Sequence, residues 1–212
     1  MYELRWFFPG SGSAPARQWL TDLAAGQVEA DPLRREVYLR YRPDIGVKIS
    51  RGGLELKQRF DTPVLLALAG GVTGMLEYWE KVEWKYADKA SEDDPVYRAF
   101  ATGQRAGERV TTEKTRLLGK FEARADVVAP VARSARPDVG LLVEVADVSM
   151  AGRPSWWTLQ FELVAAKGAS NEPALRRAVD WALAQKWPDR AALTGERSMG
   201  YPELLERIRA AR

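Results

Sequence analysis

Hydrophobic and polar residues alternate over much of the chain, with the two-residue period of β-strands whose two faces meet different surroundings. Residues 156–164 are the clearest case. One face of this segment carries Trp157, Leu159, Phe161 and Leu163, and the other carries Thr158, Gln160 and Glu162. Comparable alternation or a β-rich composition predicts further strands over residues 2–6, 37–42, 46–50, 54–60, 74–86, 108–121, 127–131 and 141–148.

Helical spacing of apolar residues is found in three other segments. Residues 14–25, 172–186 and 201–208 carry apolar side chains three to four positions apart, and Pro173 suits the first turn of the second segment. No internal repeat and no Gly-Ser linker divides the sequence. The pattern therefore predicts one domain, residues 1–212, of the α+β class, with a mainly antiparallel sheet and helices near the start and at the end.

A Gly-Gly pair at positions 52–53 separates two of the alternating runs, which is a common signal for a β-hairpin. In the second run, residues 54–60, the charged side chains Glu55, Lys57 and Arg59 share one face. A charged face this regular lies either in water or around a ligand.

Basic residues are concentrated on the expected strands rather than in tails. Residues 33–60 contain eight basic and three acidic side chains, and residues 105–124 contain six and three. Residues 76–94, which end in a polar loop expected over 87–94, contain three lysines and seven acids. The spacing alone does not separate two arrangements. The charges form either the wet outer faces of an open antiparallel sheet or the lining of a closed barrel, where Lys and Arg would converge on a polyanion.

The composition narrows the chemistry, because the 212 residues include no histidine and no cysteine. This excludes a Ser-His-Asp triad, a thiol nucleophile, and zinc sites built on imidazole or thiolate ligands. Carboxylates, Lys, Arg, Tyr and a hard cation bound by oxygen remain, and they point to phosphate chemistry. The net charge of only +3 and the acidic segment 76–94 argue against a nucleic acid as the partner.

No segment predicts a membrane span. The longest apolar run, residues 64–72, has nine residues, whereas a membrane helix needs about 20. Residues 1–8 carry Glu3 and Arg5 and lack the order of a signal peptide. We therefore expect a cytoplasmic protein that does not bind membranes.

Several short motifs follow one another along most of the chain. They are Glu3-Leu4-Arg5-Trp6-Phe7, Gly46-Val47-Lys48-Ile49-Ser50-Arg51, Leu54-Glu55-Leu56-Lys57-Gln58-Arg59, Lys114-Thr115-Arg116, Gln160-Phe161-Glu162, and the segments 174–187 and 198–205. Their order and spacing over residues 2–208 resemble the CYTH superfamily, the triphosphate tunnel metalloenzymes. This superfamily includes thiamine triphosphatase, class IV adenylyl cyclase and inorganic triphosphatases.

The resemblance implies an eight-stranded antiparallel tunnel with flanking and C-terminal helices, which binds a triphosphate or polyphosphate and hydrolyses it with Mg2+ or Mn2+. Glu3 and Glu162, the glutamates of the motifs, would act in catalysis. They would also hold the metal, together with a third carboxylate, Glu144. The phosphate-binding residues carried over from the motifs are Lys48, Lys57, Arg59, Lys114 and Arg116.

The sequence also departs from the family pattern. Arg5 stands where the first motif has its second glutamate, Phe7 stands where it has its lysine, and Gln160 replaces a glutamate of the late strand. An arginine repels a metal ion at contact distance, and a glutamine loses the charge of the carboxylate. Two alternatives to a hydrolase follow: a polyanion-binding protein on the same scaffold without catalysis, and an open-sheet protein whose basic faces bind an acidic partner or RNA.

Overall fold

The computed structural model describes residues 1–50, 53–85, 109–124, 127–132, 134–165 and 172–210. Its strands are β1 (Tyr2–Pro9), β2 (Val28–Arg42), β3 (Ile45–Ser50), β4 (Gly53–Arg59), β5 (Val64–Ala67), β6 (Thr73–Lys85), β7 (Arg109–Ala123), β8 (Val128–Pro130), β9 (Val139–Met150) and β10 (Trp156–Ala165). Its helices are α1 (Ala14–Leu23), α3 (Glu172–Ala184) and α4 (Tyr201–Ala210), with 3-10 turns η1 (Ala69–Gly71), η3 (Arg190–Ala192) and η4 (Gly195–Arg197).

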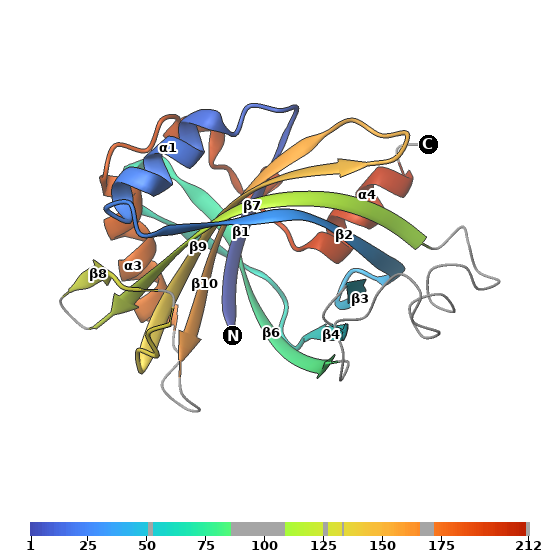
Figure 1. Ribbon diagram of the computed structural model, residues 1–212, viewed down its shortest axis with the longest axis horizontal. Helices are drawn as coiled ribbons and strands as arrows, with labels where there is room; N and C mark the ends of the chain where they lie inside the picture. Colours follow the sequence, from blue (N-terminus) through green and yellow to red (C-terminus); the bar gives the residue numbers. More distant parts are fainter. Residues whose placement is uncertain (51–52, 86–108, 125–126, 133, 166–171, 211–212) are drawn as a thin grey trace.

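Eight of these strands close into an antiparallel barrel (Figure 1). The order is β1-β10-β9-β7-β2-β3-β4-β6, and β6 pairs back to β1 through Tyr2 with Tyr78, Glu3 with Glu77, and Leu4 with Leu76. Strand β5 extends from β6, and β8 extends from β7. The closure confirms the expected eight-stranded barrel with flanking and C-terminal helices. It also shows that the alternative of an open sheet is wrong.

The main hydrophobic core lies outside the barrel wall, under α1 and α3. The apolar faces of the strands supply Leu4 and Trp6 of β1 and Leu159 of β10, all fully buried. Helix α3 packs against them with Leu175 and Val179. The alternation seen in the sequence thus separates an apolar outer face, which the helices cover, from a polar inner face.

Helix α4 covers one end of the barrel interior, where a second apolar cluster lies. Tyr201, at the start of the helix, stacks on Tyr38 of β2 with ring centres 5.3 Å apart and meets the edge of Phe7 of β1 at 5.1 Å. Leu204 and Leu205 complete this cluster from the next turn. The barrel interior is therefore apolar at the α4 end and polar beyond Tyr201.

Two strands differ from the sequence prediction. Strand β2 begins at Val28, well before the expected residue 37. The earlier start was not predicted because residues 28–36 contain Pro32 and the charged run 34–36, and show no sustained alternation. Its pairing with β7 shifts register between Asp31 and Arg34, so Pro32 falls in the irregular stretch where a missing N–H is tolerated. Strand β5 was not expected. Two expected features lie outside the described residues: Gly52 of the hairpin turn, and the loop over 87–94.

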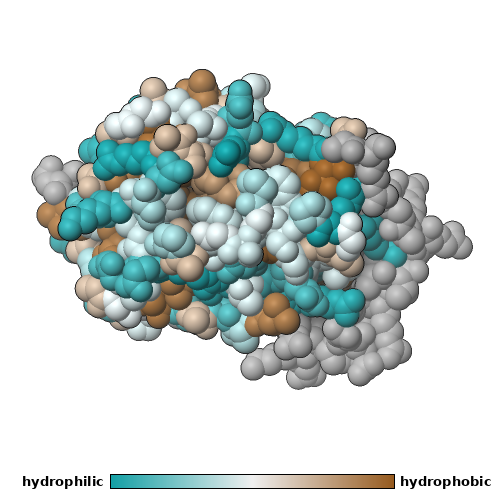
Figure 2. Space-filling model, turned by 90° about the horizontal axis from the view of Figure 1, so that it is seen from above, coloured by the Kyte–Doolittle hydropathy of each residue, from teal (hydrophilic) through white to brown (hydrophobic). Residues whose placement is uncertain are grey.

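Among the residues that the structure describes, the face seen from above has no broad apolar area. Figure 2 shows the hydrophobic residues of that face as separate small patches among hydrophilic ones, a pattern common on monomeric proteins. Within the described residues, no helix has the length and apolar character needed to cross a bilayer. The distinctive chemistry of this chain lies inside the barrel.

Candidate functional site

The barrel interior is lined by charged side chains because each strand turns its polar face inward. On β1, for example, Glu3 and Arg5 face inward while Leu4 and Trp6 enter the outer core. The register pairs the inward-facing residues of neighbouring strands directly, such as Arg5 with Gln160. Charges that are far apart in the sequence therefore meet in one small space.

An inner cavity of about 140 Å3 lies next to Tyr201 and the start of α4. Six cationic side chains and four carboxylates line it, together with aromatic rings and the amide of Gln160. The cationic residues are Arg5, Lys48, Lys57, Lys81, Lys114 and Arg116, and the carboxylates are Glu3, Glu55, Glu144 and Glu162. The described lining thus has an excess of positive charge.

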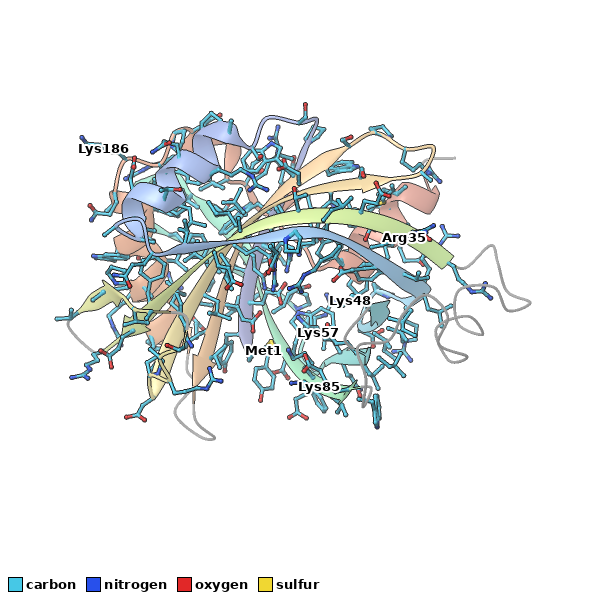
Figure 3. All side chains as sticks on the ribbon, viewed as in Figure 1. Met1, Arg35, Lys48, Lys57, Lys85 and Lys186 are labelled. Carbon is cyan, nitrogen blue, oxygen red and sulfur yellow. The ribbon has the colours of Figure 1, made fainter. Side chains whose placement is uncertain are left out.

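An outer cavity of about 310 Å3 continues from the inner one, since five residues line both. The shared residues are Lys48, Glu55, Lys81, Lys114 and Arg116. Farther out the lining includes Lys85 and the half-exposed Trp84 of β6. Figure 3 shows Lys48 and Lys57 in the barrel interior, Lys85 at the end of β6, and Lys186 on the far side of the molecule. The two cavities together form a charged channel.

Four of the five expected phosphate-binding residues line this channel. Lys48, Lys114 and Arg116 line both cavities, and Lys57 lines the inner one. Arg59 lines neither cavity. Its guanidinium Nη1 lies 2.5 Å from Glu77 Oε1 and 3.8 Å from Glu203 of α4, and this ion-pair cluster holds β4, β6 and α4 together.

Glu144 of β9 is the centre of the ion-pair network in the inner cavity. Its Oε1 lies 2.6 Å from Lys114 Nζ, and its Oε2 lies 3.2 Å from Arg116 Nη1. The Nη1 atom of Arg5 lies 3.5 Å from Glu144 Oε1. Burial alone would raise the pKa of Glu144, but the charges of these three cations lower it well below its usual range. Glu144 is therefore a carboxylate at neutral pH.

Glu3 and Glu36 are held ionised in the same way. Burial opposes the charge of Glu3, but Lys57, whose Nζ lies 3.3 Å from Glu3 Oε2, and Arg5 lower its pKa to about 2. For Glu36, burial is outweighed by the charge of Lys48 and by the hydrogen bond that the Tyr38 hydroxyl donates, so its pKa also falls to about 2. Together with Glu144, these acids form ion pairs with five interior cations, which are Arg5, Lys48, Lys57, Lys114 and Arg116.

The three residues expected to hold a metal, Glu3, Glu144 and Glu162, all line the inner cavity. Arg5 separates two of them, because its Nε donates to Glu3 Oε1 at 3.0 Å while its Nη1 faces Glu144. Within the described ranges, no group of three acidic residues has an arrangement that would hold a metal ion. The donor set around Arg5 therefore does not fit Mg2+ or Mn2+, since a guanidinium already lies between the oxygens.

Several interior residues were not expected as site residues. Lys81 and Glu55 lie on strands whose residues alternate between inward and outward positions. Their inward position follows from this two-residue period once the barrel is known to close. Arg5 was noted only as a departure from a motif, and its contacts with three strands could not be read from the sequence. Tyr201 enters the cavity because α4 covers the barrel end, and no local pattern in the sequence signals this contact.

Comparisons with known proteins gave likenesses of structure only. Neither a protein-family model nor a curated protein matches the sequence. The PH1012 protein of Pyrococcus horikoshii OT3 is similar in structure, with 12% identity, 95% of this chain and 98% of that chain covered, and a TM-score of 0.46. A chain of the Schizosaccharomyces pombe Mediator head module is also similar in structure, with 10% identity, 88% of this chain and 93% of that chain covered, and a TM-score of 0.42.

The Pct1 RNA triphosphatase of S. pombe is also similar in structure, with 11% identity, 85% of this chain and 80% of that chain covered, and a TM-score of 0.38. The strand pairing described above by itself closes the eight-stranded barrel.

Proposed function

We propose that this chain binds a linear polyphosphate, such as inorganic triphosphate, inside the barrel. The observation that carries the proposal is the excess of cationic side chains along the channel: six against four carboxylates in the inner cavity, and six against three in the outer one. The sequence motifs that resemble the CYTH superfamily point to the same class of ligand. The resemblance also implies Mg2+ or Mn2+, but we propose binding without a metal, because the Arg5 guanidinium lies between Glu3 and Glu144, where the metal would be expected.

The channel suits an extended anion because its cations come from several strands. Lys48 of β3, together with Lys114 and Arg116 of β7, lines both cavities, so these side chains lie where the two cavities meet. Arg116 offers a planar group that binds two phosphate oxygens at once, whereas Lys48 and Lys114 act as compact charges. A chain of linked phosphates is long enough to meet successive cations, whereas a single phosphate meets only one group of them.

The bound polyanion would exchange partners with the interior carboxylates. Lys48 lies 3.1 Å from Glu36 and 3.7 Å from Glu55, and Arg116 also contacts Asp31, so these two cations already have counter-charges. A ligand with several negative charges satisfies the excess cations and draws others from their pairs. We therefore expect binding that weakens with rising salt concentration, because part of its free energy is electrostatic.

Binding of tripolyphosphate is the direct test. We expect calorimetry to detect binding to the wild-type protein, and the Arg116→Gln and Lys81→Gln variants to bind at least about tenfold more weakly, since each loses a charge-assisted contact. Arg124→Gln, whose side chain is 75% exposed outside the channel, is the matched control and should bind like the wild type.

Two results would contradict the proposal. One is the absence of tripolyphosphate binding at low salt by folded protein. The other is equal binding by wild type and both channel variants, because that would place the ligand elsewhere. Orthophosphate serves as a second ligand, and it should bind much more weakly than tripolyphosphate if the length of the channel matters.

Hydrolysis of the bound chain is a second candidate function, favoured by the position of Glu162. This carboxylate lines the inner cavity and makes no ion pair with a cation of the described residues, and its Oε2 accepts a hydrogen bond from Gln160 Nε2 at 3.0 Å. Such a carboxylate is suited to orient a water molecule as a general base. Glu3 is less suited to that role, because its lowered pKa makes it a weak base.

Release of phosphate from tripolyphosphate, followed with added Mg2+ and with EDTA, tests this second candidate. If Glu162 activates water, the Glu162→Gln variant should release phosphate at least about 100-fold more slowly while binding tripolyphosphate normally. Unchanged release in the variant, or no release by wild-type protein that binds the ligand, would leave binding as the function of the channel.

A further inference from the structure

The Arg5 guanidinium occupies the centre of an oxygen-rich site contributed by three neighbouring strands. Its Nε donates to Glu3 Oε1 on β1, its Nη2 donates to Gln160 Oε1 on β10, and its Nη1 faces Glu144 Oε1 on β9 at 3.5 Å. The side chain is only 5% exposed. Two carboxylates and an amide oxygen are the kind of ligands that a hard divalent cation takes, but here they surround a side-chain cation.

Aromatic rings hold this guanidinium in place. Its central carbon lies 4.7 Å from the centre of the Tyr201 ring and 5.9 Å from that of Phe7, within the range of cation–π attraction. Burial disfavours the charge, but Glu3, Tyr201 and Glu144 together more than compensate, so the pKa of Arg5 lies above its ordinary value. A second cation placed among the same oxygens would meet a fixed positive charge at contact distance.

Two polar atoms at this position remain without a hydrogen bond. Within the described residues, Arg5 Nη1 and the Tyr201 hydroxyl are both buried and have no hydrogen-bond partner. Both residues line the inner cavity. Arg5 Nη1 forms an ion pair with Glu144 at 3.5 Å but no hydrogen bond, and the Tyr201 hydroxyl forms no hydrogen bond. Buried polar groups in native proteins nearly always form hydrogen bonds, so two such groups around one cavity point to an acceptor that fills it.

We propose that Arg5 takes the place of a divalent cation in this barrel: it neutralises Glu3 and Glu144 permanently and, with the Tyr201 hydroxyl, donates to an oxygen of the bound polyanion, so that binding requires no metal. The second half of this inference rests on the proposed polyphosphate binding. The first half, that the site accepts no metal while Arg5 is present, stands on the geometry alone and is tested without any phosphate.

The metal test uses Mn2+ and its electron paramagnetic resonance signal, which is lost when the ion is bound. We expect the wild-type protein to leave the signal of free Mn2+ unchanged. The Arg5→Glu variant places a third carboxylate beside Glu3 and Glu144 and should bind about one Mn2+ per chain, and saturating Mn2+ should raise its Tm by about 3 °C or more. Arg124→Glu changes the charge equally on the surface and should bind no Mn2+.

Arg5→Gln serves as a second variant if Arg5→Glu fails to fold, since it removes the cation and adds an amide oxygen without a new charge. Circular dichroism establishes that each variant is folded before Mn2+ is added. Binding of Mn2+ by the wild type as tightly as by these variants would overturn the inference. Failure of every folded Arg5 variant to bind Mn2+ would overturn it as well, since the oxygens would then not form a cation site.

The phosphate test compares tripolyphosphate binding in EDTA and in added Mg2+. We expect the wild type to bind at least as tightly in EDTA, and Tyr201→Phe to bind several-fold more weakly without a change in Tm. Binding that requires Mg2+ would overturn the inference while supporting the proposed function. If tripolyphosphate does not bind under either condition, the proposed function fails, and the Mn2+ experiment still decides whether Arg5 excludes a metal.

Discussion

Replacing Glu144 with alanine is expected to lower the free energy of unfolding by about 3–5 kcal/mol, because it leaves buried cations without their shared partner. Glu144 is 6% exposed and contacts Lys114 at 2.6 Å, Arg116 at 3.2 Å and Arg5 at 3.5 Å. Arg5 keeps Glu3 and Arg116 keeps Asp31, but Lys114 loses the one carboxylate within ion-pair distance among the described residues. Urea unfolding at neutral pH measures the loss.

Two further variants separate this effect from an ordinary truncation. Glu122→Ala removes a surface acid paired with the 75% exposed Arg124 and should cost less than about 1 kcal/mol. Glu144→Ala combined with Lys114→Met removes the unpaired ammonium and should recover part of the stability. If Glu144→Ala costs no more than Glu122→Ala, the buried network contributes little to folding.

Acid is expected to destabilise the fold through its buried carboxylates, and Glu36 offers the clearest measurement. Its pKa is about 2 in the folded protein against an ordinary 4.5, so the unfolded chain binds more protons between these values. The stabilisation is present above about pH 4.5 and is lost as the pH falls toward 2; for Glu36 it amounts to about 3 kcal/mol. Urea unfolding as a function of pH follows this loss.

The Glu36→Gln variant should be less stable than the wild type at neutral pH and should lose less stability in acid. Tyr38→Phe keeps the ring that stacks on Tyr201 but removes the hydroxyl that donates to Glu36 at 2.8 Å, so its pH dependence should lie between the two. Equal slopes for Glu36→Gln and the wild type over this pH interval would contradict the assigned role of Glu36.

The strands could be predicted from the sequence because alternation is a local property. The segment 156–164 matches β10, and the runs 46–50 and 54–60 match β3 and β4. Closure could not be predicted from alternation, since the same pattern fits an open sheet. It depends on three residue pairs between β1 and β6, such as Glu3 with Glu77, and no local signal specifies pairs so far apart in sequence.

The candidate site was predicted in its residue types and only partly in its contacts. Lys57, Lys114 and Arg116 line the channel as expected, because inward and outward positions follow the strand period. Arg59 does not, because Glu203 of the C-terminal helix joins Glu77 in binding it. Which acid meets which base depends on the register between strands and on the docking of α4, and neither is encoded in nearby residues.

The pairing of β1 with β10 has a consequence for how the protein folds during synthesis. Residues 2–9 pair over their full length with residues 156–163, which are synthesised about 150 residues later. Until then β1 has only its three-residue pairing with β6, and its apolar face lacks the α3 helix that covers it in the native state. Such long-range pairing slows folding and prolongs the exposure of unpaired edges. Ribosome-bound chains that stop before residue 156 should therefore be sensitive to protease and prone to aggregate.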